Sequence, residues 1–221
     1  MSSSNESYRK RIEKIRGLYV IVDPEATRGR DVIEIAKASL LGGASVIQLR
    51  DKTRDKGEIL DVARRIRELC DRHDALFIVN DDADIALLSE AHGLHVGQTD
   101  LPVGEARRVL SPEQIIGRSN NGTAEALESE GQGADYLAVG AVFSTTTMGK
   151  SGRTAVGAEM IRNVKQAVTA PVVAIGGINA ANIAEVASAG ADCICVVSAV
   201  TFADDPARAA SELVELIEGA R

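Results

Sequence analysis

The sequence predicts an α/β protein built as a (β/α)8 TIM barrel with an extra N-terminal helix. Eight short apolar runs rich in Val and Ile alternate with segments whose apolar residues recur at helical spacing. Gly-Ala-Ser (43–45) and two copies of Gly-Ala-Asp (133–135 and 190–192) stand between a helical segment and the next run, where glycine commonly ends a helix. Eight such units in 221 residues fit a compact barrel.

The runs are apolar on both faces, as buried parallel strands are. The predicted strands are 17–23, 45–51, 75–81, 93–97, 115–120, 136–143, 171–177 and 193–200. The predicted helices are 31–42, 57–70, 82–90, 104–110, 123–131, 157–169, 179–189 and 205–219. Within 57–70, for example, Ile59, Val62, Ala63 and Ile66 follow the spacing of one helix face.

Residues 1–16 precede the first strand and are expected to form a charged helix, with one barrel domain over 17–221. A doubly wound open sheet is the rival architecture. It would be favoured by a G-x-G-x-x-G turn after the first strand, where this chain has DPEATRGR.

The composition limits the class of partner. A net charge of −7 argues against binding to nucleic acid or to anionic membranes. The sequence lacks an apolar run long enough to span a bilayer, and its first residues lack the apolar core of a signal peptide, so we expect a cytoplasmic protein. The three cysteines are expected to be reduced core residues. The oligomeric state stays open, a homo-oligomer included.

Polar residues gather where the predicted strands end, which is the active-site end of such barrels. The segment QLRDK (48–52) ends the second strand and places Gln48, Arg50 and Lys52 on one face, with Leu49 and Asp51 on the other. Arginine can bind a phosphate through two parallel hydrogen bonds. We expect the whole segment to contact a phosphorylated substrate.

Two carboxylates are expected beside these cations. Asp81 ends the third strand and Asp100 follows the fourth. Paired carboxylates next to phosphate-binding cations are typical of Mg²⁺ sites, so the combination indicates a diphosphate bound with Mg²⁺. The segment Asn80-Asp81-Asp82 has an alternative interpretation as a helix cap. His95 is expected to pack within its strand, with a place in the site as the second interpretation.

A second anion site is predicted from the last strands. Gly176-Gly177 follows strand seven and Val197-Ser198 lies in predicted strand eight, where many barrels bind phosphate on backbone N–H groups. The threonines at 145–147 can add hydroxyl donors. Gly-Gly as a plain turn and a structural threonine loop are the alternatives. Two phosphorylated ligands, one of them a diphosphate, indicate group transfer with diphosphate as the leaving group.

The segments QLRDK, IVNDDADIA, HGLHVGQTDL, YLAVGAVFSTTT, VVAIGGI and VVSAV resemble, in order and spacing, the thiamine phosphate synthase family over about residues 17–202. The resemblance implies a (β/α)8 transferase that joins hydroxymethylpyrimidine diphosphate to thiazole phosphate with Mg²⁺. It implies a dissociative displacement that gives thiamine phosphate and diphosphate, without a protein nucleophile.

The resemblance also implies roles for single residues. The pyrimidine diphosphate would be bound by Gln48, Arg50, Lys52, Asn80 and Ser119. Mg²⁺ would be bound by Asp81 and Asp100. The thiazole phosphate would be bound by Thr145, Thr147, Gly177, Val197 and Ser198. The charges that act on the leaving diphosphate would come from Arg50, Lys52 and Lys150.

Two departures and three alternatives accompany the resemblance. Met148 stands where the family usually has a diphosphate-binding lysine, so Lys150 would take that role through a bulge in the loop, and Asn121 replaces a usual histidine. A thiazole tautomerase-like isomerase of the same fold would carry a catalytic histidine in strand six, where this chain has Ala141. A non-catalytic protein that binds thiamine precursors is the second alternative. A phosphosugar isomerase is more remote, because it needs no diphosphate site.

Overall fold

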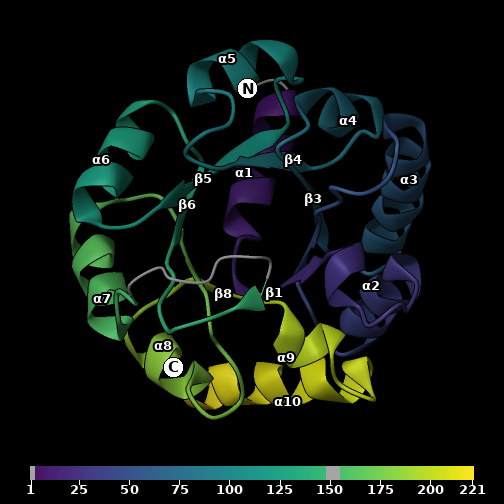
Figure 1. Ribbon diagram of the computed structural model, residues 1–221. Coiled ribbons are helices and arrows are strands. Elements are labelled where there is room, and N and C mark those ends of the chain that lie inside the picture. Colours follow the sequence, from purple (N-terminus) through teal and green to yellow (C-terminus); the bar gives the residue numbers. More distant parts are fainter. Residues whose placement is uncertain (1–2, 148–154) are drawn as a thin grey trace.

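The computed structural model describes residues 3–147 and 155–221, and it confirms the predicted barrel. The strands pair in parallel in chain order, and the last pairs with the first, so the sheet closes on itself (Figure 1). The strands are β1 (Gly17–Val22), β2 (Val46–Leu49), β3 (Leu76–Asn80), β4 (Gly93–Val96), β5 (Ile115–Asn120), β6 (Tyr136–Val139), β7 (Val172–Ile175) and β8 (Cys193–Val196).

Helices cover the outside of the barrel, as Figure 1 shows. They are α2 (Val32–Leu41), α3 (Lys56–Arg72), α4 (Ala83–Leu88), α5 (Val103–Val109), α6 (Thr123–Gly131), α7 (Ala158–Ala167), α8 (Ile183–Ser188) and α10 (Pro206–Gly219). A 3-10 turn, η1 (Pro24–Ala26), follows β1, and the short α9 (Ser198–Thr201) follows β8. Among the described residues, no helix has the length and apolar character needed to cross a membrane.

Side chains alternate between the two faces of each strand, so the apolar core forms two layers. One apolar cluster fills the barrel interior and includes Tyr19, Ile78 and Tyr136. The other lies between the barrel and its helices and includes Leu18 and Phe77. Neighbouring side chains in a strand point to opposite faces. The odd or even position of a residue along its strand, here called its parity, therefore decides whether it faces the barrel axis or the helices.

The glycines of the three Gly-Ala junctions follow helices, as predicted, and adopt the left-handed conformation that is common at helix ends. Gly43, Gly133 and Gly190 have φ values of 90°, 88° and 95°. In the two Gly-Ala-Asp junctions, the aspartate adds contacts that the sequence did not predict. One oxygen of Asp192, for example, accepts from the backbone N–H of Val172 at 2.7 Å and from the Lys165 ammonium at 2.7 Å.

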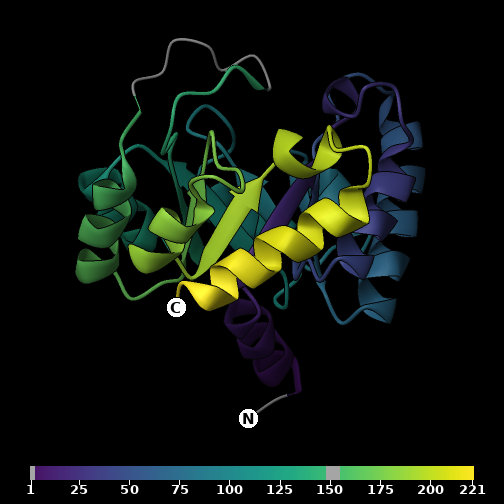
Figure 2. The same cartoon turned by 90° about the horizontal axis from the view of Figure 1, so that it is seen from below.

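The extra helix α1 (Ser3–Glu13) confirms the predicted N-terminal helix and lies against one end of the barrel (Figure 2). Tyr8 donates a hydrogen bond to Asp135, and Arg11 donates to the backbone oxygen of Glu113 at 2.7 Å. Ile15, which follows the helix, joins the apolar cluster inside the barrel. These contacts cover the amino ends of the strands, which leaves their carboxyl ends for a binding site.

Some predicted boundaries were wrong. Strand eight ends at Val196, and Ser198 begins α9 instead of lying in the strand, because Val197 leaves the extended conformation with φ −124° and ψ −89°. Helix α8 begins at Ile183, later than predicted, since Asn182 accepts a hydrogen bond from the N–H of Asn179 and forms a turn before it. The three cysteines are buried and unbridged, as expected.

Candidate active site

Two adjoining cavities open at the carboxyl ends of the strands. The smaller, of about 360 Å³, carries charged side chains and is called the ionic pocket here. The larger, of about 720 Å³, carries serines and threonines and is called the hydroxyl pocket. Both are lined by Ser119, Ala138, Ile175 and Cys195. Ligands in the two pockets would therefore meet along this common wall.

Strand parity brings one face of QLRDK into the ionic pocket. Gln48, Arg50 and Lys52 all line it, as does Asn80 at the end of β3. The Lys52 ammonium lies 2.6 Å from a carboxylate oxygen of Asp81. The pocket thus holds two fixed cations whose N–H groups can reach a phosphorylated ligand.

The structure does not bring Leu49 and Asp51 into either pocket. Leu49 is 1 % exposed and packs in the apolar layer beneath the helices. The Asp51 carboxylate accepts hydrogen bonds from the backbone N–H groups of Thr53 and Arg54 and so fixes the turn before α3. Both side chains have the parity that points away from the barrel axis.

The carboxyl groups of Asp81 and Asp100 lie together in the ionic pocket. Burial raises the pKa of Asp81, and a hydrogen bond with Asp100 adds to the rise, whereas Lys52 opposes it. For Asp100, burial also acts to raise the pKa, but hydrogen bonds from Asp81 and from the N–H of Gly97 hold it below its usual value. Two carboxyl groups held this closely repel when both are ionised, and a divalent cation would relieve that repulsion.

This donor set fits a Mg²⁺ ion that is shared with a substrate. Within residues 3–147 and 155–221, no group of three or more His, Cys, Asp and Glu side chains could hold a metal. Mg²⁺ is commonly bound by one or two carboxylates together with substrate phosphates and water, which matches a pair of aspartates beside phosphate-binding cations.

A chain of hydrogen bonds crosses the floor of the ionic pocket. The Gln48 amide donates to the Tyr19 hydroxyl at 2.6 Å, and the hydroxyls of Tyr19 and Tyr136 lie 3.2 Å apart. His95 contacts the Tyr136 hydroxyl at 3.1 Å through Nδ1 and the Ser119 hydroxyl at 2.9 Å through Nε2. His95 therefore lines the site as well as packing in its strand. The two tyrosines were missed, although their inward parity follows from the strand alternation once the register is known.

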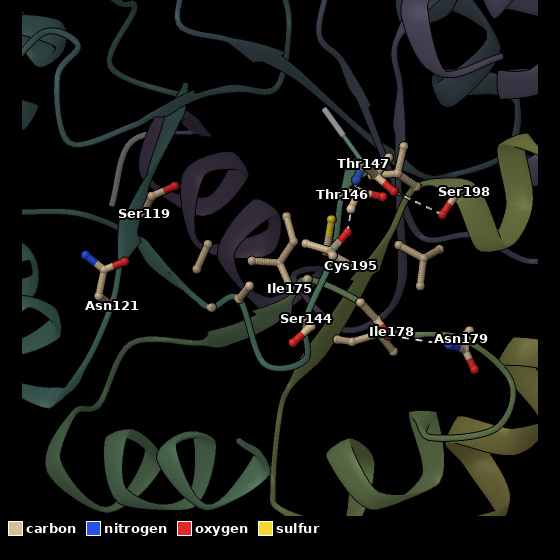
Figure 3. Close-up of a pocket in the computed structure, with 18 of the residues that line it drawn as sticks. Ser119, Asn121, Ser144, Thr146, Thr147, Ile175, Ile178, Asn179, Cys195 and Ser198 are labelled. Carbon is tan, nitrogen blue, oxygen red and sulfur yellow. Dashed lines mark hydrogen bonds between the residues drawn. The ribbon is translucent and has the colours of Figure 1, made fainter. Parts of the chain in front are cut away.

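The hydroxyl pocket gathers all the described residues that were predicted for the second anion. Thr145, Thr147, Gly177, Val197 and Ser198 line it. The hydroxyls of Thr147 and Ser198 lie 3.4 Å apart and point toward each other (Figure 3). Gly177 has φ 66°, and a Cβ there would lie 2.7 Å from the backbone oxygen of Ser144, so only glycine fits this close approach.

The sequence departs from the family pattern at Met148, where Lys150 was expected to take over the role, and at Asn121. Lys150 and Met148 lie outside the described residues. Asn121 lines the hydroxyl pocket, and its backbone N–H donates to a Glu125 oxygen at 2.9 Å. The Gln98 amide donates to the same oxygen at 2.7 Å, so Glu125 joins the loops after β4 and β5.

Comparisons with known proteins show the family to which the chain belongs. The family model described as thiamine monophosphate synthase matches residues 18–200, which is most of the chain. The chain belongs to the thiamine monophosphate synthase family. This membership confirms the resemblance that the motifs carry.

Relatives in this family match nearly end to end. The thiamine-phosphate synthase of Moorella thermoacetica is 47% identical over 204 residues, which cover 92% of this chain and 97% of that protein. That of Methanospirillum hungatei is 47% identical over 201 residues, with 91% and 97% covered. The thiamine phosphate pyrophosphorylase structure from Pyrococcus furiosus superposes with a TM-score of 0.86 at 39% identity, over 96% of this chain and 98% of the other.

Proposed function

We propose that the protein is a thiamine-phosphate synthase that joins hydroxymethylpyrimidine diphosphate to thiazole phosphate. The observation that carries this proposal is the wall common to the two pockets. One pocket offers cations and carboxylates suited to a diphosphate, and the other offers hydroxyls suited to a monophosphate. Reacting groups placed where the two pockets adjoin, beside Ser119 and Cys195, would face each other. This arrangement removes much of the entropic cost of bringing two substrates together.

In the proposed reaction, the bond between the pyrimidine methylene carbon and the diphosphate oxygen breaks, and the diphosphate takes the electron pair. The thiazole nitrogen then forms the new C–N bond with its lone pair. Arg50 and Lys52 hold the departing diphosphate and stabilise its charge, with Lys150 as the third cation. Gln48, Asn80 and Ser119 orient the pyrimidine, and no protein group bonds covalently to either substrate.

Asp81 and Asp100 would hold Mg²⁺ together with the diphosphate. When bound, the ion offsets negative charge on the leaving oxygens. In the second pocket, the hydroxyls of Thr145, Thr147 and Ser198 would donate hydrogen bonds to the thiazole phosphate. Gly177 and Val197 would let the phosphate approach the backbone.

The test is incubation of the purified protein with both precursors and Mg²⁺, followed by measurement of thiamine phosphate and released diphosphate. Formation of both products in equal amounts supports the proposal. Binding of both precursors without product would instead identify a non-catalytic binding protein. The isomerase alternative has no support from the site, because Ala141 lines the hydroxyl pocket where a tautomerase histidine was expected. The cytoplasmic location expected from the sequence is part of the proposal.

A further inference from the structure

Arg50 has a buried partner, Asp23, that lies outside the walls of both pockets. Asp23 follows β1 directly and is 0 % exposed. Arg50 lines the ionic pocket, and its side chain is 20% exposed. The guanidinium donates a hydrogen bond from one terminal nitrogen to Oδ2 of Asp23. The two side chains therefore join a fully buried carboxylate to the wall of the ionic pocket.

The two oxygens of the Asp23 carboxylate have separate tasks. Oδ1 accepts from the backbone N–H of Glu25 at 2.9 Å and caps the turn η1. Oδ2 is thereby aimed at Arg50. The backbone N–H of Arg50 donates to the carbonyl of Val22 at 3.0 Å, one residue before Asp23, so the main chain also holds the two residues side by side.

We propose that Asp23 is a positioning residue that fixes the Arg50 guanidinium for the diphosphate. A free arginine side chain samples many rotamers, and ordering it costs entropy at each binding event. One N–H committed to Asp23 fixes the plane of the guanidinium and leaves its other donors for the substrate. Donors that are already oriented stabilise developing charge without reorganisation. The inference rests on the proposed role of Arg50.

The substitution D23N tests this geometry with little change in volume. The Glu25 N–H and Arg50 contact different oxygens of Asp23. Asparagine replaces one of these oxygens with an NH2 donor, so it can serve only one of the two partners in the same place. We expect kcat/KM for the pyrimidine diphosphate to fall roughly tenfold or more, the scale seen when a partner that orients a metal ligand is removed. The KM for thiazole phosphate should stay within about twofold, because that ligand occupies the other pocket.

The decisive experiment is a cycle of D23N, R50A and the double variant, with binding of inorganic diphosphate in the presence of Mg²⁺ measured by calorimetry. If Asp23 acts through Arg50, D23N weakens binding in the wild type but adds no loss in the R50A background. Equal losses in both backgrounds, or no loss in either, overturn the inference. Unchanged binding in R50A would instead overturn the proposed role of Arg50, so the two failures are distinguishable.

A matched control separates the positioning role from the loss of a cap. Asp31 caps α2 in the same way, because its Oδ1 accepts from the N–H of Ile33 at 2.7 Å. D31N should leave diphosphate binding unchanged. If D23N does not fold, D23S replaces it, because serine still caps a turn but carries no carboxylate for Arg50. Wild-type diphosphate affinity in folded D23S would overturn the inference equally.

Discussion

Gly117 supports the polar floor of the site by leaving room for an aromatic ring. It pairs with Tyr136 across β5 and β6. A Cβ on Gly117 would lie 1.9 Å from Cζ of the Tyr136 ring, whereas ordinary contact begins at 3.4 Å. The ring would have to retreat by about 1.5 Å, the difference between these distances. Its hydroxyl would then leave its places beside Tyr19 and His95, at 3.2 and 3.1 Å.

G117A should therefore lower both stability and activity. Tyr136 is fully buried, and added volume in a close-packed core costs about 1–3 kcal/mol. For a chain of this size, 1 kcal/mol shifts Tm by about 2–4 °C, so we expect a decrease of about 2–12 °C. Differential scanning calorimetry measures the shift, and a steady-state assay measures KM for the pyrimidine substrate, which should rise.

Two comparisons make the result specific. G104A, in α5, adds a Cβ that meets no atom within 4 Å and should keep or raise Tm. Y136F keeps the ring but removes the hydroxyl. For each degree of Tm lost, Y136F should therefore raise KM more than G117A does. A G117A protein that melts within about 1 °C of the wild type would refute the reasoning, because the ring would then have yielded without cost.

Three further predictions address charge and hydrogen bonding. Chelation of Mg²⁺, or D81N, should reduce turnover roughly 100-fold in the product assay while circular dichroism and thiazole phosphate binding stay unchanged; full activity in EDTA would exclude a metal role. S198A should weaken thiazole phosphate binding roughly threefold to tenfold by calorimetry, the value of one hydrogen bond, and equal weakening of diphosphate binding would contradict the assignment of pockets. Burial, followed by the charges of neighbouring cations, lowers the pKa of His92 to about 3, and its Nδ1 accepts from the N–H of Phe77. In the unfolded chain His92 binds a proton near pH 6.5, whereas in the folded chain it stays neutral down to about pH 3, so stability is lost as pH falls. Urea unfolding should show roughly 1 kcal/mol less stability at pH 5.5 than at pH 7. H92N should lack this difference.

The sequence by itself determined the fold class and most of the pocket membership. Strand and helix periods are local properties, so the eight strands and the helices between them could be predicted from short runs of sequence without any long-range contact. Parity within QLRDK places Gln48, Arg50 and Lys52 on the face that lines the ionic pocket. The prediction that the whole segment contacts the substrate went further than this parity, and Leu49 and Asp51 line neither pocket. Since the polar segments follow strand ends, a barrel must bring them to one face, and the two predicted anion sites follow from this rule.

Only the tertiary structure decided which side chains meet. The contact of Asp23 with Arg50, the close approach of Asp81 to Asp100 and the chain from Gln48 to Ser119 join different strands across the barrel mouth. These pairings depend on the stagger between strands and on closure of the sheet, which no local pattern specifies. The place of Ser198 at the start of α9 depends in the same way on how the chain turns after β8. The sequence thus determines what the site contains, whereas barrel closure decides how its parts contact one another.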